Sequence, residues 1–255
     1  MPGQRDIDKT HLSLLNAEER GFIHRDYIAH CLRWSHVVKH LGQRQLYKKA
    51  RIVDVGCGKE MPLLKTLYTM KMTPALYMGI DANKIKLMDI HQKIAEKMRV
   101  EKFMVEDEFD FSQDFSYNAP INLIDPHVIT CFEVLEHSSP AKVIKILANI
   151  HKIANTNTII FISTPCFNGK AAANHINEMT YEYMEALLLT SEFNIISRWG
   201  TFASQKDIEP QLTGDSLQQA YECLKDYYDS NLLSILFAPL FPKYSRNVIW
   251  KLTIS

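Results

Sequence analysis

The sequence predicts an α/β fold, a mostly parallel sheet of seven strands with helices on both faces. Short apolar runs alternate along the chain with segments whose apolar residues recur every three or four positions, which is the pattern of repeated strand–helix–strand units. A tight turn with two glycines follows the first apolar run. Such a turn is typical of a buried parallel strand that opens onto a ligand-binding loop.

Seven apolar runs fit strands. They comprise residues 51–55, 76–80, 101–105, 127–132, 158–163, 193–199 and 247–254. Between them, helical periodicity predicts helices over about 61–70, 83–98, 139–153 and 181–189. Ser139 followed by Pro140 is a favourable helix start, because serine is a good N-cap and proline suits the first helical position.

The amino-acid composition limits which classes of protein this chain can belong to. The 255 residues carry no net charge and are 46% hydrophobic, which fits one large globular domain without a global basic field. Five scattered cysteines without C-x-x-C spacing argue against a disulfide framework and a zinc site, and favour a reducing cytoplasm. Apolar runs fall short of the ~18 to 20 residues of a membrane span, so we expect a cytoplasmic protein with no membrane partner.

The stretch that organises the chain is residues 51–58, where a buried strand leads into Asp54, Gly56 and Gly58. Glycines lack a β-carbon, so the backbone can turn sharply and a ligand can approach it closely. A dinucleotide fingerprint would need a third glycine at position 61, where Met61 stands. This departure disfavours a nicotinamide-dependent oxidoreductase. A purely structural strand-to-helix turn is the other interpretation.

Asp81 stands at the tip of the second strand, about 25 residues after the glycine turn. Its two oxygens can accept hydrogen bonds from both hydroxyls of a ribose. The alternative is that Asp81 caps the helix expected over 83–98.

The exit of the fourth strand carries Glu133, Glu136 and His137 at spacing i, i+3, i+4. If this segment makes one helical turn, all three side chains lie on one side. Two carboxylates and an imidazole suit either a divalent metal or general acid–base chemistry. His175 follows the fifth strand, and loops at the carboxyl ends of neighbouring parallel strands face one crevice.

The Asp-x-Gly-x-Gly element resembles motif I of the class I S-adenosylmethionine (SAM) methyltransferases, and Gly79-Ile80-Asp81 resembles their second motif. The resemblance covers about residues 45–200. It implies a Rossmann-like fold whose seventh strand is antiparallel, with SAM as the cofactor. It further implies that Asp54, Gly56 and Gly58 serve the methionine end of SAM, that Asp81 serves the ribose, and that Asp107 serves the adenine amino group.

The E-x-x-E-H element resembles two methyltransferase groups, one acting on ubiquinone precursors and one on the terminal 2′-hydroxyl of small RNAs. In both, the acids and the histidine help to hold a divalent metal that binds the acceptor oxygens. The resemblance thus implies Glu133, Glu136 and His137 as ligands, with His175 as a fourth. The same string occurs in metal-free members of the class, so a structural or cofactor-shell role stays open. Glu133, His137 and His175 are the candidate catalytic bases.

Two segments lie outside these motifs. Residues 1–45 carry an expected helix over about 16–40 with several histidines and arginines, and residues 204–244 form an insert rich in aromatics and leucine. The helix is interpreted either as an amphipathic helix with a solvated basic side or as a lid over the site. We therefore divide the chain into a helical lid (1–45) and a main domain (46–255), and expect the insert to be helical and to cap the acceptor pocket.

The activity that follows from the resemblance is SAM-dependent methylation of an oxygen or nitrogen. The acceptor is a small molecule, a nucleotide or a nucleic acid, and the basic residues of the first helix favour an anionic acceptor. The alternative is a binding module that holds SAM without turnover, as a subunit of a modification complex.

Overall fold

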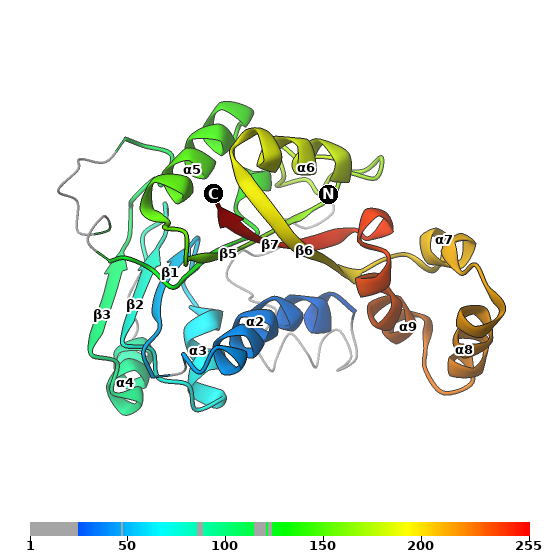
Figure 1. Ribbon diagram of the computed structural model, residues 1–255, viewed down its shortest axis with the longest axis horizontal. Helices are drawn as coiled ribbons and strands as arrows, with labels where there is room; N and C mark the ends of the chain where they lie inside the picture. Colours follow the sequence, from blue (N-terminus) through cyan, green and yellow to red (C-terminus); the bar gives the residue numbers. More distant parts are fainter. Residues whose placement is uncertain (1–24, 47, 86–88, 115–120, 122–123) are drawn as a thin grey trace.

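The computed structural model describes residues 25–46, 48–85, 89–114, 121 and 124–255. Within these residues, seven strands form one sheet in the order β3-β2-β1-β4-β5-β7-β6 (Figure 1). The strands are β1 (Arg51–Val55), β2 (Leu76–Ile80), β3 (Lys102–Glu106), β4 (Val128–Phe132), β5 (Ile159–Pro165), β6 (Phe193–Phe202) and β7 (Asn247–Ile254).

The pairing of the strands confirms the predicted topology. β1 pairs in parallel with both β2 and β4, and β2–β3 and β4–β5 are parallel as well. β7 runs antiparallel to both β5 and β6. Parallel neighbours need a crossover, usually a helix, and this requirement accounts for the alternation of strands and helices along the sequence.

Helices cover both faces of the sheet (Figure 1). α5 (Pro140–Ile153) and α6 (Tyr181–Thr190) pack on one face, while α2 (Arg25–Gln43), α3 (Pro62–Thr69) and α4 (Asp89–Met98) pack on the other. Successive strand residues point to opposite faces, so Val53 lies in the core under α5 and α6, whereas Ile52 lies in the core under α2 and α3.

The expected helix over 83–98 is shorter in the structure, where α4 begins at Asp89. Two acidic side chains hold the preceding backbone instead. The Asn83 amide donates to Asp81 Oδ1 (2.8 Å), and the Ile85 amide donates to Asp107 Oδ2 (2.9 Å). Residues 86–88 lie outside the described residues.

α2 is the observed part of the expected N-terminal helix, whose earlier residues lie outside the described part of the chain. Its buried side chains, including Val37 and Leu41, pack towards α3 and the sheet. The expectation of a solvated basic side is wrong in part, because Arg33 and His40 are buried while Lys39 is exposed. His36 stacks on Trp199 of β6, with ring centroids 4.3 Å apart.

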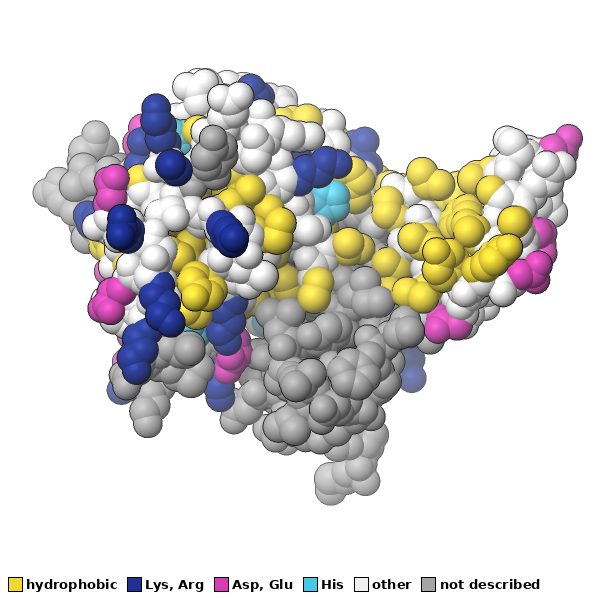
Figure 2. Space-filling view, turned by 90° about the horizontal axis from the view of Figure 1, so that it is seen from below, with side chains coloured by type: hydrophobic (Ala, Val, Ile, Leu, Met, Phe, Trp, Pro, Cys, Tyr) yellow, Lys and Arg dark blue, Asp and Glu magenta, His cyan; other side chains and the backbone are white. Residues whose placement is uncertain are grey.

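The insert is helical, as predicted. It comprises α7 (Gln205–Ile208), α8 (Asp215–Lys225), α9 (Ser230–Phe237) and three 3₁₀ turns, over a small hydrophobic core of its own. It leaves the sheet at Phe202 and returns at Arg246, whose amide donates to the Phe202 carbonyl (2.9 Å). Hydrophobic side chains gather on its surface (Figure 2), and Tyr227, Leu236 and Leu240 are among those exposed.

No helix in the described part of the chain combines the length and the apolar character needed to cross a lipid bilayer.

Candidate cofactor and metal site

The glycine turn packs directly on the segment that follows β4. Gly56 and Gly58 both have positive φ angles, 72° and 63°. A β-carbon on Gly56 would lie 2.1 Å from Val134 Cγ2, so only glycine allows this close approach. A β-carbon on Gly58 would meet no atom within 4 Å. The turn therefore borders open space at Gly58, where a ligand can approach the backbone.

Asp81 is joined to the glycine turn from the end of β2. Its Oδ2 atom accepts from the Gly58 amide at 3.0 Å, and its Oδ1 atom accepts from the Asn83 amide. The alternative that Asp81 caps a helix beginning at residue 83 is wrong, because residues 83–85 are not helical. The placement beside Gly58 is the one that a ribose-binding acid needs, and the ribose contact itself stays a prediction.

Asp54 lies inside the sheet, with 4% of its surface exposed. The Tyr77 hydroxyl donates to one carboxylate oxygen (2.5 Å) and the Thr130 hydroxyl donates to the other (2.6 Å). Burial raises the pKa of Asp54 to about 6, although both hydrogen bonds oppose the shift. Asp54 thus fixes the strands beneath the glycine turn, and its contact with the amino group of a ligand stays a prediction.

Glu133 does not share a helical turn with Glu136 and His137. Its φ angle is +57°, and the 3₁₀ turn η2 covers only Leu135–His137. The left-handed residue redirects the chain, so the i, i+3, i+4 argument does not apply. The Glu133 carboxylate accepts from Asn247 Nδ2 (3.0 Å) and Ser163 (2.9 Å) and faces Arg33 Nη2 at 2.8 Å.

Glu136, His137 and His175 do come together. One ligand atom from each residue lies within 4.8 Å of the others. Glu136 is buried, and its Oε2 atom accepts from the Thr164 hydroxyl at 3.1 Å. Its Oε1 atom lacks a hydrogen-bond partner among the described residues and lies 3.9 Å from His137 Nε2.

The electrostatics of the cluster fit a cation. Burial raises the pKa of Glu136 well above its ordinary value, and the Glu133 charge adds to the shift. Burial also lowers the pKa of His137, which keeps the imidazole neutral near pH 7. An unpartnered buried carboxylate oxygen is costly, and a divalent ion bound by this carboxylate and the two imidazoles would remove that cost. These three residues therefore fit a metal, and Glu133 is outside the set.

The chain matches a known protein family. The methyltransferase-domain family matches residues 24–185, which is more than half of the chain. The chain belongs to this family. SAM is accordingly the cofactor of this methyltransferase, and its binding in the open space at Gly58 beside Asp81 stays a prediction.

Solved structures share the fold of this methyltransferase at low identity. It resembles the magnesium protoporphyrin IX methyltransferase of Synechocystis PCC 6803, which holds S-adenosylhomocysteine (SAH), at TM-score 0.57 and 12% identity over 98% of this chain and 92% of that chain. It also resembles the SAH-bound 1,6-didemethyltoxoflavin-N1-methyltransferase of Burkholderia thailandensis, at TM-score 0.55 and 14% identity over 89% and 78% of the two chains.

The [4+2]-cyclase SpnF is similar as well, at TM-score 0.53 and 14% identity over 86% of this chain and 80% of that chain. The fold therefore does not determine the reaction by itself. No curated protein sequence matches this chain.

Sequence reasoning missed the residues that surround the site of this methyltransferase. Arg33 and Asn247, which hold Glu133, come from opposite ends of the chain, and no local pattern links them. Glu178 contacts His175 through a short hydrogen bond and forms an ion pair with Arg246. In the sequence, the contact between Glu178 and His175 is indicated only by their spacing of three residues in a polar loop.

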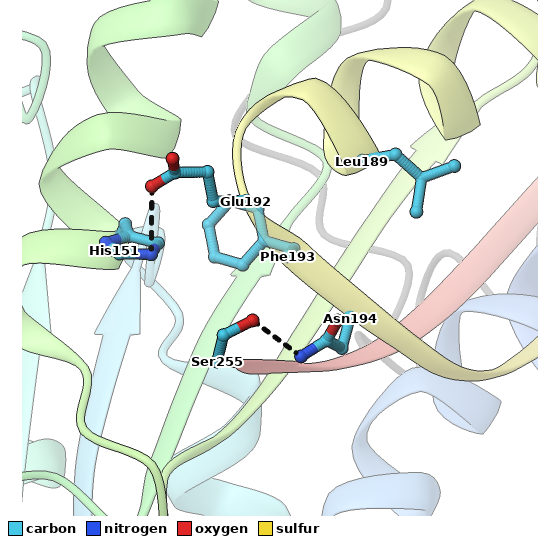
Figure 3. A pocket seen from close by; sticks show the side chains of 6 residues that line it. All are labelled: His151, Leu189, Glu192, Phe193, Asn194 and Ser255. Atoms are coloured by element: carbon cyan, nitrogen blue, oxygen red, sulfur yellow. Dashed lines mark hydrogen bonds and ion pairs between the residues drawn. The ribbon is translucent and has the colours of Figure 1, made fainter.

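A separate shallow pocket lies where α5 and α6 end and β6 begins (Figure 3). Its lining residues are His151, Leu189, Glu192, Phe193, Asn194 and Ser255. Helices α5 and α6 end near the amino ends of the parallel strands, whereas Gly56 and Asp81 follow the carboxyl ends of β1 and β2. This pocket is therefore at the sheet edge opposite to Gly56 and Asp81.

Proposed function

We propose that this methyltransferase transfers the methyl group of SAM to an oxygen of its acceptor, with a divalent cation held by Glu136, His137 and His175. The observation that carries the proposal is the buried, unpartnered Oε1 atom of Glu136 within this cluster. The cluster directly follows Val134, which packs on Gly56. This packing supports the proposal, because it places the segment that carries Glu136 and His137 directly against the glycine turn.

The main task of the protein in methyl transfer is to align the acceptor with the methyl group of SAM. The positive sulfur of SAM already makes the methyl group electrophilic, so the acceptor must be aligned and lose its proton. A divalent ion, when bound, lowers the pKa of a coordinated hydroxyl. In this proposal one ring nitrogen of His137 faces the Asn174 carbonyl and the other binds the cation, so His137 is a ligand and the acceptor loses its proton to solvent. Glu133 is occupied by Arg33 and Asn247, which argues against its role as base.

For the acceptor we propose an anionic molecule, namely a nucleotide, a nucleic acid or a phosphorylated small molecule. The support is that the Arg33–Glu133 pair places α2 beside the exit of β4, while the sequence of α2 carries further basic residues such as Arg25 and His30. We propose α2 as a lid and the insert as a cap, because α9 of the insert contacts α2. This surface also offers exposed apolar side chains for a base or ring.

We propose a reducing, cytoplasmic location. The support is that the five cysteines are all free, and Cys57, Cys131 and Cys166 are buried. Burial raises the pKa of the Cys166 thiol to about 12, which keeps it unreactive.

The deciding experiment is methyl transfer from labelled SAM into fractionated cell extract, with and without EDTA and added Mg²⁺ or Mn²⁺. We expect label in one fraction, loss of transfer with EDTA, and loss in Glu136→Ala. Glu101→Ala, at an exposed acid between α4 and β3, is the matched control. Transfer that survives both EDTA and Glu136→Ala would refute the cation and leave the methyltransferase intact. SAH binding without transfer to any fraction would favour the non-catalytic module.

A further inference from the structure

The two histidines of the cluster have Nδ1 atoms beside groups that act only as acceptors. Nδ1 of His137 lies 3.1 Å from the backbone carbonyl oxygen of Asn174. Nδ1 of His175 lies 2.5 Å from Glu178 Oε1. A carbonyl oxygen or a carboxylate cannot donate, so each Nδ1 must carry the proton. In a neutral ring the Nε2 atom then keeps its lone pair, which is the state that binds a metal.

Glu178 is held as an ionised carboxylate by its other contacts. Its side chain is buried, and Arg246 Nη2 donates to Oε1 at 2.7 Å and to Oε2 at 2.6 Å. The Ala172 amide donates to Oε1 as well, at 3.0 Å. A guanidinium that is always charged donates to both oxygens, and this favours the ionised carboxylate of Glu178 over the protonated one.

Arg246 is in turn fixed to the sheet. Its Nη1 atom donates to the Cys166 carbonyl at 2.5 Å, and its backbone carbonyl accepts from the Cys166 amide at 2.8 Å. A continuous series of contacts therefore runs from the start of β7 through Arg246 and Glu178 to the ring of His175.

We propose that Glu178 is the positioning residue of the metal site, and that it sets the tautomer and orientation of His175 for the cation while Arg246 holds Glu178 in place. This inference rests on the proposed function. Partners that orient metal-binding histidines typically change metal affinity by about 10- to 100-fold when they are removed. His137 depends on a backbone carbonyl instead, so its tautomer is insensitive to substitution at position 178.

The chain offers a matched control for loss of a glutamate–arginine pair. On α6, Glu185 Oε1 accepts from Arg198 Nε at 2.5 Å and from the Tyr181 hydroxyl at 2.7 Å. These contacts of Glu185 involve no histidine. Glu185→Gln therefore breaks an ion pair on the same part of the fold without touching the cluster.

The first measurement uses the full-length, metal-free wild-type protein. Long-range ¹H–¹⁵N correlation NMR reports which ring nitrogen of each histidine is protonated. We expect the Nδ1–H tautomer at both His137 and His175. An Nε2–H tautomer at His175 would overturn the inference, and this test does not depend on any variant folding.

The second measurement compares Mn²⁺ affinity by calorimetry in the wild type, Glu178→Gln and Glu185→Gln. We expect a loss of about 10- to 100-fold in Glu178→Gln only, with a mixed tautomer at His175 and an unchanged one at His137. Equal Mn²⁺ affinity in all three proteins would overturn the inference. If the wild type binds no Mn²⁺, the proposed cation fails, and a tautomer that changes only at His175 in Glu178→Gln would still support the positioning role of Glu178.

Discussion

The guanidinium of Arg33 in α2 lies 2.8 Å from the carboxylate of Glu133 at the end of β4, and Arg33 is only 2% exposed. Asn247 of β7 and Ser163 of β5 donate to the same carboxylate. One acidic side chain thus ties the N-terminal helix to two strands beside the candidate metal cluster.

The left-handed backbone of Glu133 makes the role of its side chain testable. Glu133→Ala and Glu133→Gly both remove the carboxylate that faces buried Arg33, and we expect each to lower the free energy of unfolding by about 2 kcal/mol or more. A φ angle of +57° is strained for alanine but not for glycine. Glu133→Gly should therefore be more stable than Glu133→Ala by about 1 kcal/mol. Urea denaturation measures both differences. An alanine variant as stable as the glycine variant would contradict the backbone argument.

The two glycines of the turn should differ in what they tolerate. In Gly56→Ala the new methyl group meets Val134 at 2.1 Å, so strain and overpacking together should cost roughly 2 to 4 kcal/mol. In Gly58→Ala the methyl group meets only open space, and the positive φ angle alone should cost about 1 kcal/mol. Denaturation ranks the two variants.

Gly58→Ala should affect cofactor binding more than it affects stability. Its methyl group occupies the space that we assign to SAM, so SAH affinity should fall although the fold is nearly intact. Calorimetry with SAH measures this loss. Unchanged SAH affinity would place the cofactor elsewhere.

Asp81→Asn tests the ribose contact. Loss of a charged acceptor is worth about 1.5 to 3 kcal/mol, so SAH affinity should fall by roughly 10- to 100-fold. Asp114→Asn is the control, because Asp114 is an exposed acid after β3. If both variants bind SAH as tightly as the wild type does, Asp81 has no part in cofactor binding.

Asp54 should give the protein a pH-dependent stability. Its pKa is about 6 in the folded state against an ordinary 3.8, so the folded state binds the proton more tightly. The stabilisation is complete below about pH 4 and is lost as the pH rises through 6. Between pH 4.5 and 7.5 this loss amounts to roughly 2 kcal/mol.

Asp54→Asn cannot ionise, so its stability should lack this decline. The amide can still hydrogen-bond the hydroxyls of Tyr77 and Thr130, which can each act as acceptor or donor. Urea denaturation of both proteins across the same pH range provides the comparison. Parallel stability curves would show that Asp54 titrates alike in the folded and unfolded states.

The sheet could be predicted from the sequence because strand periodicity is local. β2 and β7 have the predicted bounds, and Asp81 lies at the tip of β2 as expected. The helix predicted to begin at residue 83 is wrong over residues 83–85, where contacts with the side chains of Asp81 and Asp107 hold a non-helical backbone that local periodicity does not indicate.

The candidate site was predictable only in part. His175 joins Glu136 and His137 because loops after neighbouring parallel strands meet at one edge. The departure of Glu133 depends on Arg33 and Asn247, which are 100 and 114 residues away along the chain. Contacts of this kind arise from tertiary packing, so the local periodicity of the sequence does not predict them.

The insert between β6 and β7 begins and ends at hydrogen-bonded neighbours, Phe202 and Arg246. Its helices also bury a separate apolar nucleus. Because the two ends of the insert are neighbours, a segment of different length or sequence could join the same two residues while every strand keeps its register. Changes in the sequence or length of this insert can therefore be accommodated without disturbing the sheet.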